Sequence, residues 1–211
     1  MLKKGYFITF EGPDGSGKTT VSTQVFEKLS AAGYDVIYTR EPGGIDIAEQ
    51  IRQVILDPKN TAMDSKTEAL LYAASRRQHL VEKIIPALNK HQIVICDRFV
   101  DSSLVYQGLA RGIGIEPVYA INRFAIDEYL PDLTIYLAIS AADGLARISS
   151  RTNKDRLDQE ELSFHQAVED GYQQIIKMFK DRYQIVDANR DLEAIVNDSY
   201  RLITALVQAH V

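Results

Sequence analysis

Cysteine and histidine are both scarce in this chain of 211 residues, and each shortage argues against a class of protein. The single cysteine, Cys96, cannot form a disulfide bond within the chain, so no disulfide framework is expected. The four histidines are scattered without the spacing of metal ligands, which argues against a zinc site. We therefore expect a protein of the reducing cytoplasm, in which Cys96 is a small buried strand residue.

The chain also lacks an excess of positive charge and any long apolar run. Its formal net charge is −5 and its isoelectric point is about 5.4, whereas binding to a nucleic-acid backbone normally requires a basic face. Glu11 interrupts the first apolar run too early for a signal peptide, and no apolar stretch approaches the ~20 residues of a membrane span. We expect small-molecule partners, no nucleic acid and no membrane.

Short apolar runs alternate with longer segments of helical periodicity. Strands are predicted at residues 6–10, 36–39, 93–96, 133–139 and 183–186. Helices are predicted at residues 18–32, 46–56, 66–89 with a kink or break near Pro86, 102–110, 117–128, 141–151, 158–180 and 191–208. This alternation predicts an α/β fold with one domain over residues 1–211, a three-layer αβα sandwich around five parallel strands.

A glycine-rich loop, FEGPDGSGKTT, follows the first predicted strand and precedes a predicted helix. Gly12, Gly17, Lys18 and Thr19 complete the GxxxxGK[ST] pattern of a phosphate-binding loop in the context that this loop requires. Its glycines, Gly15 included, let backbone N–H groups surround phosphates, Lys18 reaches the β and γ oxygens, and the Thr19 hydroxyl suits Mg²⁺. A glycine turn that only caps the helix would need one glycine and no lysine.

A phosphate-binding loop predicts nucleoside triphosphate binding but does not by itself choose between GTPases, motor ATPases and small-molecule kinases. A GTPase should carry an NKxD segment that reads guanine. The nearest string, at residues 153–155, lacks this spacing and follows a predicted helix. The GTPase reading is therefore disfavoured.

Asp97 and Arg98 directly follow the strand at residues 93–96, at the sheet edge where open α/β sheets bind ligands. Asp97 can hold a Mg²⁺-bound water, and Arg98 can bridge phosphate oxygens. A surface ion pair at a strand end is the alternative. The TREPGG segment exposes Arg40 and Glu41 on the same edge of the predicted sheet.

Tyr72 and Arg76 lie four residues apart on the predicted helix 66–89, beside its apolar stripe. A ring next to a guanidinium suits a planar base that carries a carbonyl oxygen, because the ring can stack while the guanidinium donates. A core tyrosine beside an arginine that reaches for solvent is the alternative.

Six segments together resemble thymidylate kinase, in order and over nearly the whole chain. They are FEGPDGSGKTT, TREPGG, AASRRQHL, CDRFVDSSLVYQG, PDLTIYL and DRLDQE. The resemblance implies a P-loop NTPase fold, transfer of the γ-phosphoryl group of ATP to dTMP with Mg²⁺ to give dTDP for dTTP synthesis, and a homodimer. Where many members read DRY, this chain has Asp97-Arg98-Phe99, and where some place phenylalanine over the base it has Tyr72.

The resemblance also assigns roles to single residues. It implies that Asp14 accepts a hydrogen bond from the 3′-hydroxyl of dTMP and that Tyr106 closes the sugar pocket against a 2′-hydroxyl. It also implies that Arg98 lies near the phosphate of dTMP. The other residues assigned to dTMP are Arg40 and Arg52 at the phosphate, and Tyr72, Arg76, Ser103 and Gln107 at the base. The residues assigned to ATP are Gly12, Pro13, Asp14, Gly15, Ser16, Gly17, Lys18, Thr19 and Thr20.

A second cation is expected from residues 147–157, because the loop position after Asp14 is Gly15, where some thymidylate kinases carry an arginine. This basic segment lies between two predicted helices and suits either a solvated loop or a lid over phosphates. By its position in the family pattern we expect Arg151 to be the catalytic cation beside Lys18 and Arg98. Arg147 and Arg156 are then supporting phosphate contacts.

Two other functions remain open at this stage. One is a kinase of the same fold with another acceptor, such as a different nucleotide or an alcohol, which would need a carboxylate base. The other is a nucleotide-dependent switch that binds nucleotide without turnover. Thermal-shift screening of nucleoside monophosphates separates the first from a dTMP kinase, and formation of ADP on addition of dTMP separates the second.

Overall fold

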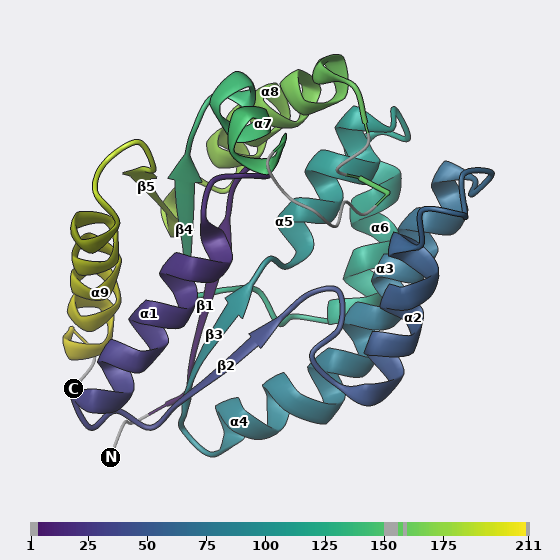
Figure 1. Ribbon diagram of the computed structural model, residues 1–211. Coiled ribbons are helices and arrows are strands. Elements are labelled where there is room, and N and C mark those ends of the chain that lie inside the picture. Colours follow the sequence, from purple (N-terminus) through teal and green to yellow (C-terminus); the bar gives the residue numbers. More distant parts are fainter. Residues whose placement is uncertain (1–3, 150–155, 158–159, 210–211) are drawn as a thin grey trace.

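The computed structural model describes residues 4–149, 156–157 and 160–209 and contains one five-stranded parallel sheet (Figure 1). The strand order is β2-β3-β1-β4-β5, and every neighbouring pair is parallel. The strands are β1 (Tyr6–Glu11), β2 (Val36–Arg40), β3 (Ile93–Asp97), β4 (Leu133–Ala138) and β5 (Tyr183–Asp187). All five lie where the apolar runs predict them, to within two residues at each end.

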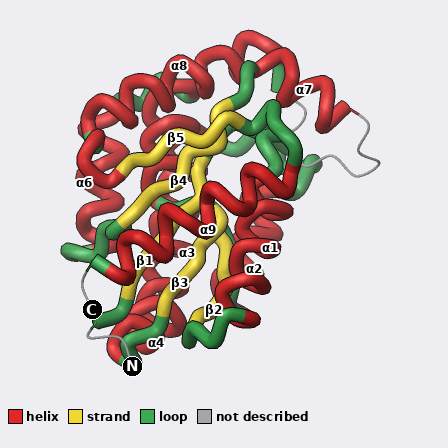
Figure 2. The backbone as a smooth tube through the Cα atoms, turned by 90° about the vertical axis from the view of Figure 1, so that its left-hand side faces the viewer, coloured by secondary structure: helices red, strands yellow, loops and turns green. Residues whose placement is uncertain are grey.

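Helices cover both faces of the sheet. On one face lie α1 (Lys18–Ala31) and α9 (Leu192–Gln208), and in Figure 2 α9 crosses in front of the strands. The other face carries α3 (Ser65–His79), α4 (Ile85–Asn89), α5 (Val100–Ser103), α6 (Ile115–Ile126) and α8 (Leu162–Met178). Next to these, α2 (Asp46–Leu56) packs on α3 and α7 (Ala141–Ser149) on α8. The predicted three-layer sandwich is confirmed.

The two cores follow from the alternation of side chains along each strand. In β1, Tyr6, Ile8 and Phe10 point to the core under α1 and α9, whereas Phe7 belongs to the core on the opposite face. Both sets are buried because both faces are covered, so the strand reads as one continuous apolar run. Cys96 is likewise buried in β3, as expected.

The helix near Pro86 is not broken. A π-helical turn, Leu80–Ile84, connects α3 to α4, and Pro86 lies in the first turn of α4. Proline has no N–H to donate, and a wider turn before it accommodates the lost hydrogen bond. The chain therefore runs on as helix from Ser65 to Asn89.

The remaining helix boundaries differ from the predictions by a few residues. The predicted helix 102–110 begins at Val100 and continues as a π-helical segment, Leu104–Ala110. The predicted helix 117–128 is α6, which ends where Asp127 turns to a φ of 51°. The expected ends at residue 151 and residue 158 lie outside the described residues. Among the described residues, no helix is long and apolar enough to cross a membrane.

Candidate active site

The phosphate-binding loop joins β1 to α1 at the carboxyl edge of the sheet. Gly12, Gly15 and Gly17 have positive φ values of 152°, 80° and 85°. A residue with a side chain would be strained at such values. Gly15 also presses against α7, since an added Cβ would lie 2.2 Å from the carbonyl oxygen of Gly144. The position after Asp14 therefore has no room for a side chain, in keeping with its lack of an arginine.

The side chain of Lys18 folds back over this loop. Its Nζ donates to the carbonyl oxygen of Pro13 at 2.8 Å and to Oγ of Ser16 at 3.3 Å. Burial lowers the pKa of Lys18 to about 8, and the charge of Arg98 adds to this effect. Because both of these hydrogen bonds from the buried ammonium go to neutral oxygens, it can exchange them for the oxygens of a polyanion.

Thr19 and Asp97 meet beside the loop. Oγ1 of Thr19 donates to Oδ2 of Asp97 at 2.5 Å, whereas Oδ1 of Asp97 is buried without a hydrogen-bond partner among the described residues. No group of three or more His, Cys, Asp or Glu residues in the described part of the chain could hold a metal ion. The pair fits Mg²⁺, which often takes few protein ligands and completes its shell with phosphates and water.

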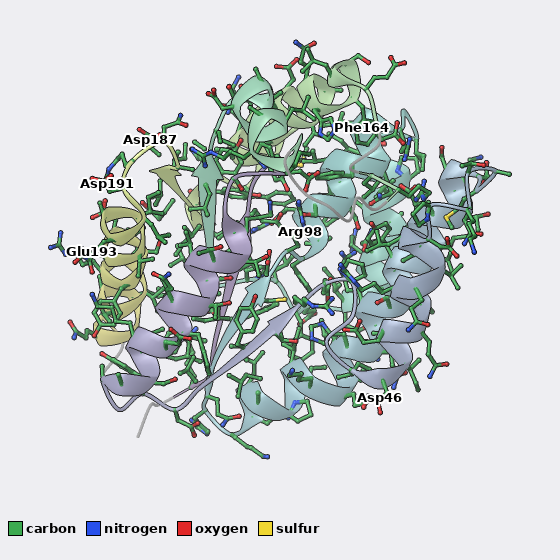
Figure 3. The ribbon with its side chains drawn as sticks, viewed as in Figure 1. Asp46, Arg98, Phe164, Asp187, Asp191 and Glu193 are labelled. Carbon is green, nitrogen blue, oxygen red and sulfur yellow. The ribbon has the colours of Figure 1, made fainter. Side chains whose placement is uncertain are left out.

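Arg98 lies at the carboxyl end of β3, near the middle of the molecule in Figure 3, with a left-handed φ of 69°. Its Nη1 donates to the carbonyl oxygen of Gly12 at 3.2 Å and to Oγ of Ser102 at 3.0 Å. Its Nη2 donates to Oδ1 of Asp14 and to the Tyr106 hydroxyl. The guanidinium thus links the phosphate-binding loop to the segment after β3.

Asp14 is the acidic centre of this group. The Tyr106 hydroxyl donates to its Oδ2 at 2.8 Å, and Arg98 holds the other oxygen. Burial alone would raise the pKa of Asp14, but the charges of Arg98 and Lys18 and the hydrogen bond from Tyr106 lower it below the ordinary value. Asp14 is therefore an ionised acceptor at neutral pH.

Glu11, the last residue of β1, supports the segment after β3 from below. Its carboxylate accepts from the backbone N–H of Phe99 at 2.8 Å, from Oγ of Ser102 at 2.6 Å and from the Tyr172 hydroxyl at 2.8 Å. Burial, with repulsion from Asp101, raises the pKa of Glu11 to about 6. The sequence reasoning missed this role because the partners lie far away along the chain.

Arg76 is buried on α3 and held on nearly every side. Its Nε donates to Oε2 of Glu41 at 2.7 Å, and its Nη1 donates to Oγ of Ser103 at 3.1 Å and to Oδ1 of Asn122. Its Nη2 donates to the carbonyl oxygen of Phe99 at 3.0 Å. The guanidinium is therefore a fixed wall of the site, unlike an arginine that reaches for solvent.

One cleft of about 250 Å³ collects these groups. Its walls come from the phosphate-binding loop, the turn after β2, α2, α3 and the segment after β3. The predicted site residues that line it are Asp14, Gly15, Gly17, Lys18, Thr19, Thr20, Arg40, Arg52, Tyr72, Arg76, Asp97, Arg98, Ser103, Tyr106 and Gln107. The loop residues Gly12, Pro13 and Ser16 are not among its lining residues.

Arg40 and Arg52 converge on the turn that follows β2. Nη1 of Arg40 and Nη1 of Arg52 donate to the same carbonyl oxygen of Pro42, at 2.8 and 2.9 Å. Nη2 of Arg40 also bonds to Oε1 of Glu49 at 2.8 Å. The peptide bond between Glu41 and Pro42 is cis. Both guanidinium groups thus lie on the cleft wall away from the phosphate-binding loop.

Two of the three arginines expected from residues 147–157 are described, and they lie in different places. Arg147 reaches the carbonyl oxygen of Gly15 at 3.5 Å and that of Ala188 at 3.1 Å, beside the phosphate-binding loop. Arg156 instead donates to the carbonyl oxygen of Ile55 at 2.9 Å and to the Glu68 carboxylate, next to α2 and α3. Arg151 lies outside the described residues.

Glu68 is a second residue that the sequence reasoning missed. It is buried on α3 and contacts Gln107, Arg111 and Arg156. Its position four residues before Tyr72 on the same face of one helix is a signal that could have placed it beside the base-reading residues.

Comparison with known proteins shows the family. A family profile described as thymidylate kinase matches residues 10–199. The chain is 57% identical over 201 residues to the thymidylate kinase of Bacillus velezensis, covering 94% of this chain and 95% of that one. It is 56% identical over 198 residues to the enzyme of the same name from Staphylococcus haemolyticus, covering 93% and 96%.

A solved structure extends this similarity to the fold. The crystal structure of thymidylate kinase from Ehrlichia chaffeensis superimposes with a TM-score of 0.77 at 34% identity, over 95% of this chain and 98% of that one. Both the sequence and the arrangement of strands, helices and phosphate-binding loop therefore agree with one family along almost the entire length. This chain belongs to the thymidylate kinase family.

Proposed function

We propose that this chain transfers the γ-phosphoryl group of ATP to dTMP with Mg²⁺, forming dTDP and ADP for dTTP synthesis. The observation that carries the proposal is that one cleft contains a phosphate-binding loop at one end and a buried aromatic–guanidinium pair at the other. Asp14, Tyr106 and Arg98 lie between the two ends. A donor phosphate chain and an acceptor nucleotide can thus meet in line within one site.

The donor end is proposed to bind ATP. The backbone N–H groups of residues 14–20 surround its phosphates, and Lys18 exchanges its bonds to Pro13 and Ser16 for phosphate oxygens. Thr19 and Asp97 would hold Mg²⁺, which offsets charge on the β and γ phosphates. Arg147, beside Gly15, is suited to a further contact with the nucleotide.

The acceptor end is proposed to bind dTMP. Tyr72 stacks on thymine, Arg76 donates to its O4 carbonyl, and Ser103 and Gln107 contact the polar edge of the base. Arg40, Arg52 and Arg98 hold the acceptor phosphate.

The sugar of dTMP is proposed to lie against Asp14 and Tyr106. Asp14 accepts a hydrogen bond from the 3′-hydroxyl, a role that its lowered pKa supports. The Tyr106 ring, held by Asp14 and Arg98, fills the space that a 2′-hydroxyl would need.

The reaction requires the protein to align the two substrates and to neutralise their negative charge. The acceptor is an anionic phosphate oxygen, so no strong general base is required, but two anions must be held against their repulsion. Lys18 and Arg98 are proposed to stabilise the transferring oxygens. Arg151 is proposed as the further catalytic cation, with support from Arg156.

The assembly and location are also proposals. Exposed apolar side chains on the neighbouring helices α2, α3 and α6, with Phe124 the most exposed at 88%, would be covered in a homodimer. The lone, buried thiol of Cys96 suits the reducing cytoplasm.

Thermal-shift measurements with a panel of nucleoside monophosphates, followed by a coupled assay for ADP, test the function. We expect dTMP to raise the melting temperature most and to be required for ADP formation from ATP. Stronger stabilisation by another monophosphate would favour a different acceptor. Stabilisation by ATP without dTMP-dependent ADP would favour a switch or binding protein.

A further inference from the structure

Glu68 forms a buried junction between the base pocket and two arginines. Only 1% of its side chain is exposed. Its Oε1 accepts from Nε2 of Gln107 at 2.8 Å and from Nε of Arg111 at 3.5 Å, and its Oε2 accepts from Nη2 of Arg156. Arg111 is held in turn by Glu160, whose Oε1 lies 2.7 Å from its Nη2.

These contacts decide which way the Gln107 amide is turned. Both oxygens of the Glu68 carboxylate accept from guanidinium groups, and the Gln107 atom that donates to it is Nε2, so the NH₂ group of the amide lies beside Glu68. Gln107 lines the cleft. The amide atom left for a ligand in the cleft is therefore the oxygen Oε1, an acceptor.

Arg76 presents the complementary group to the same pocket. Four of its five N–H groups are directed to Glu41, Ser103, Asn122 and the Phe99 carbonyl, which leaves one N–H on Nη2 without a partner among the described residues. The pocket thus offers one donor and one acceptor. Thymine offers the matching acceptor at O4 and donor at N3, whereas cytosine offers a donor at N4 and an acceptor at N3.

We infer that Glu68 determines base specificity by fixing the Gln107 amide with its oxygen toward the base. Glu68 acts through Gln107 and is a positioning residue that does not contact the nucleotide. The inference deepens the proposed function and rests on it, because it assumes that the acceptor is dTMP. A glutamine at position 68 could donate to Oε1 of a flipped Gln107, which would then present its NH₂ group to the base.

The test compares kcat/KM for dTMP with kcat/KM for dCMP in wild type, Glu68→Gln and Glu160→Gln. Glu160→Gln is the matched control, because it removes the same charge beside the same Arg111 without touching Gln107. We expect the dTMP-to-dCMP ratio to fall by about tenfold or more in Glu68→Gln and to stay at the wild-type value in Glu160→Gln. General damage to the fold would lower both kcat/KM values together and leave the ratio unchanged.

Glu68→Met provides a second variant, since its side chain neither accepts from nor donates to Gln107, although it also removes the carboxylate that pairs with Arg111 and Arg156. It should also lower the ratio, and circular dichroism verifies that each variant is folded. If a folded Glu68→Gln or Glu68→Met keeps the wild-type ratio of kcat/KM for dTMP to kcat/KM for dCMP, the role of Glu68 is overturned. A wild-type protein that does not phosphorylate dTMP contradicts the proposed function, whereas dTMP preference with an unchanged ratio in the variants contradicts only the inference.

Discussion

Single residues in the cleft hold one another in place through buried charge. Arg98 is bonded to Asp14, Gly12 and Ser102, and Lys18 is bonded to the loop that it covers. These hydrogen bonds within the protein offset much of the free energy lost when the charged groups are buried. On binding, substrate phosphates can take the place of these hydrogen-bond partners while the cations stay in position. Short local patterns pointed to Lys18 and Arg98 and the family resemblance to Asp14, and all three side chains line the cleft.

Glu11 gives a prediction about pH. The pKa of its carboxyl is raised from 4.5 to about 6 in the folded protein, so the protonated form is favoured by folding. This contribution to stability is complete below about pH 4.5 and is lost as the pH rises through about 6. The loss is on the order of 2 kcal/mol of unfolding free energy for a shift of this size.

Urea unfolding of wild type and Glu11→Gln at several pH values measures this loss. The unfolding free energy of the wild type, relative to that of Glu11→Gln, should fall by roughly 2 kcal/mol between about pH 4.5 and pH 7. Taking the difference cancels the titration of groups that both proteins share. A difference that does not change with pH would show that Glu11 titrates normally.

Contacts between elements explain features that the motif alone does not. The phosphate-binding loop is built against α7, and Gly15 is the point of closest approach. Likewise, the segment after β3 is held by Glu11 of β1 and Tyr172 of α8. A pattern in a short window cannot report such contacts, because the partners are up to 161 residues apart.

Gly15→Ala should destabilise the protein more than Gly33→Ala. Both glycines have nearly the same φ, 80° and 84°, so the backbone strain of an alanine is matched at about 1 kcal/mol. Only Gly15 faces an obstacle, since an added Cβ would meet Gly144 whereas nothing lies within 4 Å at Gly33. We expect a total loss of about 3 kcal/mol for Gly15→Ala and weaker ATP binding.

Denaturant unfolding and calorimetric titration of ATP provide the measurements. Gly33→Ala should keep the wild-type affinity for ATP, because it lies at the far end of α1 from the loop. Equal losses of stability in the two variants would contradict the close packing of the loop against α7.

The segment at residues 147–157 gives the second prediction at this scale. If Arg151 is the cation that the loop lacks, Arg151→Ala should lower kcat by roughly 10³ to 10⁵ with a smaller effect on the KM for dTMP. Arg190→Ala is a suitable control, because Arg190 pairs with Asp198 on the surface at 2.8 Å. Steady-state kinetics measure kcat for both variants. A kcat of Arg151→Ala within about threefold of wild type would show that Arg151 is not this cation and would favour Arg147 or Arg156.

The fold as a whole could be predicted almost completely from the sequence, whereas the site could be predicted only in part. Apolar runs such as β1 are set by burial on both faces and are visible locally. The helix at residues 66–89 was predicted with a kink or break near Pro86, whereas it is unbroken, and the π-helical turn that accommodates the proline leaves no local signal. The position of Glu68 four residues before Tyr72 could have placed it near the base, but its contacts with Gln107 and Arg156 could not be predicted, because these residues are distant in the chain.

The state of assembly gives the prediction for the whole molecule. Phe124 on α6 is 88% exposed, and Leu70 on the neighbouring α3 is 56% exposed. Phe124→Glu would place a charge at the proposed dimer interface and should shift the protein to a monomer, because an unpaired charge is costly to bury. Ile185→Glu, on β5 and 59% exposed, is the control and should leave the dimer intact.

Sedimentation velocity at several protein concentrations measures both variants. A wild-type protein that sediments as a monomer at all concentrations would contradict the homodimer. A dimer that survives Phe124→Glu would place the interface on another face of the molecule.

Transfer of radioactive phosphate from γ-labelled ATP tests the central claim most directly, namely that the cleft joins a phosphate donor to dTMP. Wild type should convert dTMP into labelled dTDP, with one ADP formed for each dTDP. Lys18→Ala should remain folded and lose this activity by orders of magnitude, because the ammonium acts on developing charge and is not part of the apolar core. Label appearing only as inorganic phosphate, or near-normal transfer by folded Lys18→Ala, would contradict the account.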